Sequence, residues 1–234
     1  MPQSEGIASR LAVMTAARIA FLVLLLVVIS VFYLGGSVTK YPVSSRIVFV
    51  TVAAAFASAG TFAALLRSGR RLALLAETQL VIDQITWTAI VYVSGGATSG
   101  ATSFYALTAL VGAIVTGQRG AAVAATSGVA VYTLMCAAFW LRVVVPPADQ
   151  APSLYTVDGA QLVYPLLVNT LGIVVVALLA GYLAERLRLT GGALVEATQR
   201  AVDAERLAAL GRLSAGLAHE IRNPRVRSWD PSRS

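Results

Sequence analysis

Residues 17–34, ARIAFLVLLLVVISVFYL, decide the class of fold to which this chain belongs. Arg18 is the one charged side chain among them, and almost all the others are apolar. A membrane-spanning helix needs about 20 mostly apolar residues to cross a hydrocarbon layer of about 30 Å. The stretch therefore predicts a transmembrane helix. No small-residue cleavage site follows it, so we expect an uncleaved anchor rather than a signal peptide.

The composition of the whole chain agrees with a membrane protein. Hydrophobic residues make up 57% of the 234 residues and charged residues only 12%. This leaves too little polar surface for a soluble globule and excludes both a cytosolic enzyme and a disordered chain. Cys136 is the single cysteine, which excludes a disulfide or a thiolate metal site within one chain. We predict an all-α fold: a polytopic helical bundle of about six spans, then a cytoplasmic coiled-coil or dimerisation helix.

Apolar stretches place the spans in residues 1–184, the predicted membrane input domain. The predicted spans are Ala17–Leu34, Ile47–Leu66, Leu74–Val93, Ser103–Thr116, Ala121–Leu141 and Leu162–Leu183. The outer loop of residues 142–161 is too short and proline-rich to form an extracellular sensor domain. A stimulus must therefore act within the membrane or through another membrane protein.

The distribution of positive charge predicts the orientation of these spans. One side carries Arg10, Arg18, Arg67, Arg70, Arg71, Arg119, Arg186 and Arg188, and the other carries Lys40, Arg46 and Arg142. Lysine and arginine collect on the cytoplasmic side of membrane proteins, so we expect both termini in the cytoplasm. The same rule accounts for the net charge of +7 without nucleic acid as a partner.

The third predicted span is the most polar, because it contains Glu77, Gln79, Asp83 and Gln84. A charged side chain facing lipid costs about 2.5–3.5 kcal/mol. One hypothesis makes Asp83, with Gln79 and Trp87 one helical turn to either side, an intramembrane sensing site. The other places Glu77 at the cytoplasmic interface near Arg70 and Arg71 and gives Asp83 a hydrogen-bond partner on a neighbouring span. The glycine-rich Ser94–Gly100 after this span lacks the Lys-Ser or Lys-Thr of a phosphate loop, and a tight turn is expected.

The composition changes after Ala184, where charged residues alternate with Leu, Val and Ala. We predict a helical linker over residues 185–206, with Gly191-Gly192 as a weak point. Within residues 207–224 the spacing of apolar residues predicts a leucine stripe on one face of a helix that packs in a dimer. The stripe consists of Leu207, Leu210, Leu213, Leu217 and Ile221. His219 lies about 180° from this stripe, so it faces solvent or a docking partner.

The stretch around His219 carries a resemblance to a known family. Ala218-His219-Glu220-Ile221-Arg222-Asn223-Pro224, preceded by Leu210-Gly211-Arg212-Leu213-Ser214-Ala215-Gly216, resembles the phosphoacceptor box of bacterial two-component sensor histidine kinases. The six-span region is similar to the input domains of kinases like the type IV pilus sensor, through the third span and Ser94-Gly95-Gly96.

This resemblance implies a protein histidine kinase, a phosphotransferase of the bacterial inner membrane. It implies that His219 accepts the γ-phosphoryl group of ATP and passes it to the receiver domain of a response regulator. Glu220 is implied as the general base and Asn223 as the residue that positions water for dephosphorylation of the regulator. It also implies a homodimer. A zinc-protease interpretation of His-Glu fails, because the chain has no second histidine.

The tail of residues 225–234 departs from the family pattern, since RVRSWDPSRS has no helical period where a second helix and an ATP-binding domain would follow. We therefore expect a chain truncated after the phosphoacceptor box, with ATP bound by a domain it lacks. Two alternatives stay open. One is a non-catalytic membrane partner or decoy of a full-length kinase, and the other is a small transporter.

Overall fold

The computed structural model describes residues 2–32, 40–67, 71–155 and 159–222, and these residues are almost entirely helical. The helices are α1 (Pro2–Phe32), α3 (Pro42–Leu66), α4 (Leu72–Val93), α5 (Ser103–Thr116), α6 (Gln118–Trp140) and α7 (Gly159–Arg222). Short 3-10 turns are η2 (Gly96–Thr98), η3 (Gly100–Thr102) and η4 (Pro152–Leu154). No strand occurs in the described ranges. The predicted all-α membrane bundle is confirmed.

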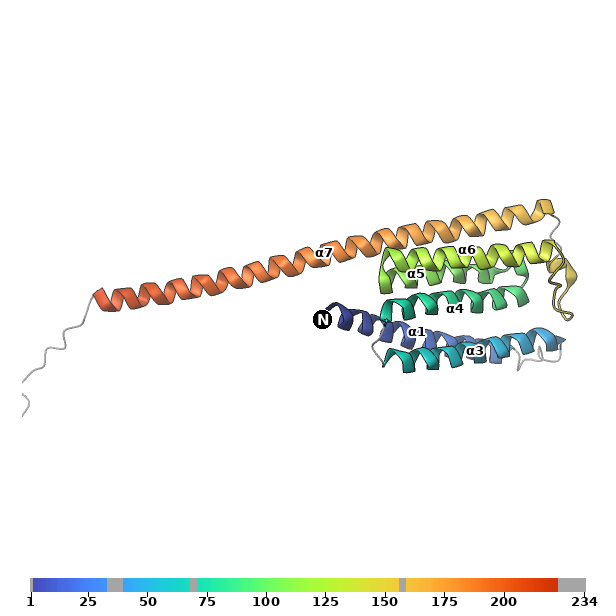
Figure 1. The fold of residues 1–234 in the computed structure, drawn as a ribbon, viewed down its shortest axis with the longest axis horizontal. Coiled ribbons are helices and arrows are strands. Elements are labelled where there is room, and N and C mark those ends of the chain that lie inside the picture. Colours follow the sequence, from blue (N-terminus) through green and yellow to red (C-terminus); the bar gives the residue numbers. More distant parts are fainter. Residues whose placement is uncertain (1, 33–39, 68–70, 156–158, 223–234) are drawn as a thin grey trace, which may run out of the picture. The chain divides into compact units, whose positions relative to one another are not determined.

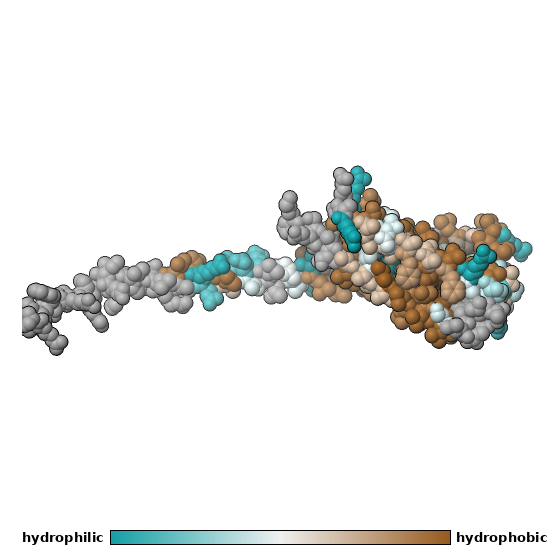
Figure 2. Space-filling view, turned by 90° about the horizontal axis from the view of Figure 1, so that it is seen from below, coloured by the Kyte–Doolittle hydropathy of each residue, from teal (hydrophilic) through white to brown (hydrophobic). Residues whose placement is uncertain are grey.

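Four helical stretches of the described residues are long and apolar enough to cross a membrane: Leu11–Val31, Pro42–Leu66, Gln118–Trp140 and Gly159–Ala208. The other two predicted spans correspond to helices that do not qualify by themselves. Helix α5 has only 14 residues, and α4 is long enough but carries the polar residues of the third predicted span. Apolar side chains cover much of the bundle surface in Figure 2, as expected where lipid replaces water.

Helix α4 has a central place, which explains how it tolerates polar residues. It packs against α1, α3, α5 and α6, and Figure 1 shows it between these helices in the bundle. A helix surrounded by others meets little lipid, so its polar side chains can find partners on its neighbours.

The chain divides into two compact units, Met1–Glu185 and Arg186–Ser234. The first unit holds the bundle and the beginning of α7. Within the second unit the described backbone is helical to Arg222, through Gly191-Gly192.

Helices α5 and α6 form a tight hairpin that depends on glycine. Gly117 has φ +72°, a left-handed conformation that glycine adopts at little cost. A Cβ at Gly120 would lie 2.2 Å from the carbonyl oxygen of Gly112, and one at Gly112 would lie 2.5 Å from the oxygen of Gly120. The two backbones are therefore in direct contact, as small residues allow in membrane proteins.

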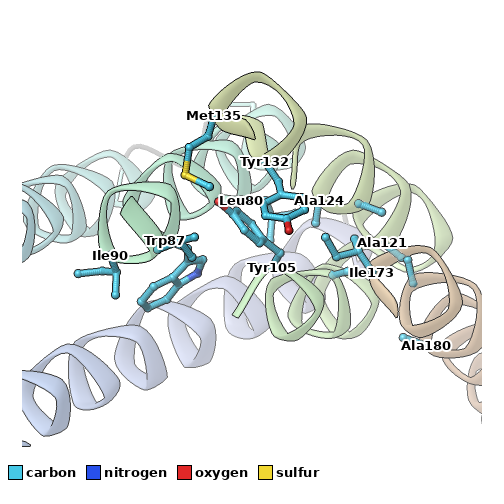
Figure 3. Close-up of a cluster of buried hydrophobic side chains, with 14 of the residues drawn as sticks. Leu80, Trp87, Ile90, Tyr105, Ala121, Ala124, Tyr132, Met135, Ile173 and Ala180 are labelled. Carbon is cyan, nitrogen blue, oxygen red and sulfur yellow. The ribbon is translucent and has the colours of Figure 1, made fainter. Parts of the chain in front are cut away.

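The core of the bundle combines aromatic side chains with small residues. Tyr105 and Tyr132 are fully buried, with ring centroids 5.7 Å apart. Figure 3 shows them beside Leu80 and Ala124 in the same cluster. The buried Ala121, Ala124 and Ala125 of α6 fill the small-residue role expected for the alanine-rich spans.

A carboxylate from the outer loop caps the start of α3. Asp149 accepts hydrogen bonds from the backbone N–H of Ser44 at 2.8 Å and from its hydroxyl at 2.7 Å. Burial raises the pKa of Asp149, but the hydrogen bonds that it accepts, those from Ser44 first, together outweigh burial and hold the pKa below its usual value. The contact ties a long loop to a helix N-terminus, where negative charge is favourable.

Candidate intramembrane site

An ion pair joins α1 to α4 inside the bundle. Arg18 Nη2 lies 2.8 Å from Asp83 Oδ1, and the two side chains are only 8% and 13% exposed. Most of the surface of the pair is therefore shielded from lipid and water. A buried charge without a partner is strongly destabilising, so each residue requires the other.

Arg18 also connects α1 to α3. The same Nη2 donates a hydrogen bond to Ser58 Oγ at 2.9 Å, and the guanidinium carbon lies 5.8 Å from the centre of the Phe62 ring. Nη1 is buried and has no hydrogen-bond partner among the described residues. One guanidinium thus links three helices and retains unused donor capacity.

This placement corrects the assignment of Arg18 to the charges of the cytoplasmic side. The residue lies within the membrane-capable stretch Leu11–Val31 and pairs inside the bundle. The signal was present in the sequence, because a single arginine inside a long apolar run needs an interior partner. Without Arg18, the predicted cytoplasmic segments still hold more positive residues than the outer loops, so the predicted orientation is unchanged.

Trp87 lies one turn beyond Asp83 on α4 and is the centre of an aromatic cluster. Its indole N–H donates to Thr108 Oγ1 of α5 at 2.9 Å. The ring contacts Phe21 edge to face, with centroids 5.5 Å apart, and Phe104, with centroids 4.8 Å apart. Trp87 is thereby held in one orientation, and Figure 3 shows its place in the buried cluster.

A cavity of about 230 Å³ lies beside this ion pair and this aromatic cluster. Its lining is mostly apolar, and it comes from α1, α3, α4 and α5: Met14, Ala17, Arg18, Phe21, Leu22, Ala55, Asp83, Thr86, Trp87, Leu107, Thr108 and Val111. Asp83 and Trp87, two residues of the predicted sensing site, thus line one cavity.

Gln79, the third residue of that hypothesis, is not among the residues that line the cavity. Its side chain is fully buried, and neither amide atom has a hydrogen-bond partner in the described part of the chain. Glu77 pairs with Arg119 of α6, with 2.6 Å between Oε1 and Nε. Arg119 is thus a partner of Glu77 that was not expected, and the predicted neighbourhood with Arg70 and Arg71 stays a prediction, since Arg70 lies outside the described residues.

Gln84, a further polar side chain of the core, was not identified from the sequence as a structural link. Gln84 donates from Nε2 to the backbone oxygens of Ala124 at 2.7 Å and Tyr105 at 3.3 Å. Gly128 leaves room for it, because a Cβ there would lie 2.8 Å from that nitrogen. Gln84 thus joins α4 to α5 and α6.

A second polar cluster connects α7 to the bundle. Asn169 accepts from the Thr102 hydroxyl at 2.8 Å and donates to the Tyr132 hydroxyl at 3.0 Å. It also donates to the backbone oxygen of Pro165 at 2.9 Å. Pro165 lies inside α7 and cannot donate a backbone hydrogen bond, so the helix is locally weakened where Asn169 holds it.

The predicted phosphoacceptor residues lie at the end of the described chain. The backbone of His219 and Glu220 belongs to α7, and Asn223 lies outside the described residues. Leu207 and Leu210, the first members of the leucine stripe, are 70% and 60% exposed in the single chain.

Comparison with known proteins gives one match. The family model described as the PilS-like transmembrane domain matches residues 3–193. Among curated proteins and solved structures, none matches the chain significantly.

Proposed function

The chain belongs to the family of PilS-like transmembrane domains, and we propose that it is the membrane sensor part of a two-component histidine kinase system. The observation that carries this proposal is the order of two features along one chain. A family domain over residues 3–193 is followed by a phosphoacceptor-like box over residues 207–224. Input and output elements of a sensor kinase are expected in this order.

His219 is the proposed phosphoacceptor. Its ring nitrogen attacks the γ-phosphorus of ATP, the bond from that phosphorus to the ADP oxygen breaks, and Glu220 takes the proton from the other ring nitrogen. The phosphoryl group then moves to an aspartate of the receiver domain of a response regulator. Asn223 would orient the water that later hydrolyses this aspartyl phosphate. ATP would be bound by a histidine-kinase ATP-binding domain, on whichever chain carries it.

We propose a homodimer in the bacterial inner membrane, with both termini in the cytoplasm. The exposure of Leu207 supports the dimer, since an apolar side chain of the predicted stripe becomes buried against a partner helix. The excess of arginine in the predicted cytoplasmic segments supports the orientation.

The stimulus would be detected within the membrane, where Asp83 and Trp87 line the cavity beside Arg18. The described backbone from Ala184 to His219 is helical throughout, so no folded domain intervenes. This distance corresponds to about 53 Å of α-helix. A change in the bundle would reach His219 through the packing of this helix with its dimer partner.

Phosphorylation of the chain in membranes tests the proposal. Radiolabelled ATP is added with and without a separately supplied histidine-kinase ATP-binding domain, to the wild type and to His219→Gln. We expect acid-labile label on the wild type when the domain is supplied, and none on His219→Gln. As a control for general damage to the helix, Arg206→Gln, an exposed position in the linker before the box, should retain the label. Label that survives in His219→Gln, or a wild type that is never labelled, would refute the assignment of His219.

A further inference from the structure

We propose that the cavity beside Arg18 and Asp83 binds a small uncharged aromatic molecule that carries a hydrogen-bond donor, such as a phenol or an indole. The molecule would arrive through the lipid. This inference deepens the proposed sensory function and rests on it, because the bound molecule would be the stimulus.

The size of the cavity limits the ligand to one or two rings. Its volume is about 230 Å³, whereas an apolar protein cavity of about 150 Å³ is enough to bind benzene. A complete lipid or a peptide helix is far too large. A single water molecule would leave most of the apolar lining without contact.

The walls favour an aromatic ring. Trp87 and Phe21 both line the cavity, and their rings already meet edge to face. The hydrogen bond to Thr108 holds the indole of Trp87 in place. A third ring can join such a cluster in the offset or edge-to-face arrangement that aromatic groups prefer.

The charges at the wall select an uncharged ligand with a donor group. Arg18 and Asp83 form an ion pair through the carboxylate oxygen Oδ1, so the two charges compensate each other and the pair gives neither an anion nor a cation a net attraction. The Asp83 side chain lines the cavity and remains 13% exposed. No described residue donates a hydrogen bond to its other oxygen, which can therefore accept one from a ligand O–H or N–H.

The opening of the cavity faces the lipid side of the bundle. Leu107 is 42% exposed, and Ala17 is also exposed, although both line the cavity. A larger groove of about 480 Å³ lies between α4 and α6, but no charged side chain lines it. Ordinary acyl chains would fill that groove, whereas the smaller cavity presents a carboxylate that acyl chains cannot satisfy.

Fluorescence quenching of Trp87 tests the site directly. In the full chain with Trp140→Phe and Trp229→Phe, Trp87 is the remaining tryptophan. The chain in lipid nanodiscs is titrated with 4-bromophenol, a heavy-atom quencher, and with 4-bromoanisole, which has the same ring but no O–H. We expect saturable quenching by 4-bromophenol with an affinity at least about tenfold higher than for 4-bromoanisole, as the loss of a hydrogen bond to a charged group implies.

Two controls separate the cavity from simple partitioning into lipid. A chain with Trp87→Phe and Trp229→Phe, in which the remaining tryptophan is Trp140 with 62% of its surface exposed, should show linear quenching without saturation. Ala17→Phe places a ring in the cavity and should abolish saturation at Trp87, whereas Asp83→Asn should reduce the preference for the phenol. Linear quenching at Trp87, or equal affinity for the two probes, would overturn the proposal.

The outcome for the site is distinguishable from the outcome for the proposed function. Saturable binding without labelling of His219 would retain the cavity ligand and refute the sensor kinase. Labelling of His219 without saturable binding would retain the kinase and refute this cavity as its ligand site.

Discussion

The ion pair between Arg18 and Asp83 allows the most quantitative prediction. Removing either charge should destabilise the bundle strongly, and removing both should cost much less than the sum of the two single changes. The three variants are Arg18→Gln, Asp83→Asn and the double variant. Asparagine matches aspartate in size, and glutamine keeps a hydrogen-bonding group although it is shorter than arginine, so the double variant serves to separate the coupling of the two charges from the other losses.

The magnitude follows from the burial of the pair. With 8% and 13% of the side chains exposed and 2.8 Å between the charged atoms, solvent screening is weak. Breaking a buried pair by removing one partner costs about 3–5 kcal/mol, because the other charge stays buried and unpaired. Two single variants at about 3 kcal/mol each, and a double variant also near 3 kcal/mol, give a coupling energy of about 3 kcal/mol.

The assay is reversible unfolding of the purified chain in mixed micelles. Helix content is followed by circular dichroism as the fraction of denaturing detergent increases. Arg46→Gln serves as a matched control, because Arg46 is exposed near the start of α3 and its loss should change stability by less than about 0.5 kcal/mol.

Additivity of the two single variants would refute the reasoning. If the double variant lost the sum of the two single losses, within about 0.5 kcal/mol, the charges would not be coupled. The 2.8 Å contact would then contribute nothing, and the candidate site would lose its electrostatic basis.

Three further predictions concern the hairpin, the outer loop and the linker. Gly120→Ala should destabilise the bundle by about 1–3 kcal/mol, because its Cβ would lie 2.2 Å from the α5 backbone. Gly172→Ala is the control, since nothing lies within 4 Å of a Cβ at that position. Equal stabilities of the two variants would contradict the close packing of α5 and α6. Asp149 has a lowered pKa, so its contribution to stability is present above the unfolded-state pKa of about 3.9 and is lost as the pH falls through the lower folded-state value. At pH 6 the melting temperature of the wild type should therefore exceed that of Asp149→Asn, and the difference should become smaller as the pH is lowered. A difference in melting temperature that does not depend on pH would refute this role of Asp149. Gly192→Ala, at an open helical position, should stabilise the linker helix by about 1 kcal/mol, measured by hydrogen exchange of the linker amides; unchanged exchange would contradict it.

Much of the architecture could be predicted from the sequence, because the information is local. A long apolar run identifies a membrane helix wherever its neighbours lie, and residues 17–34, 47–66, 121–141 and 162–183 were recognised in this way. The helix after Ala184 was equally readable, since periodicity is a property of one segment, and the role of the box around His219 stays a prediction. The third span was the least regular, and its polar residues left two hypotheses open, of which the partner for Asp83 on a neighbouring span agrees with its pairing with Arg18.

The tertiary structure alone decided which polar groups meet. Asp83 pairs with Arg18, 65 positions earlier (83 − 18) in the chain, and Asn169 links α7 to Thr102 and Tyr132. Gln79 lies on the same helix and has no such partner among the described residues. Hydropathy determines that a helix crosses the membrane, but it does not determine the rotation of that helix or the neighbour that each face contacts. Those depend on how glycine and alanine let the backbones approach, which is settled only when all the helices pack together.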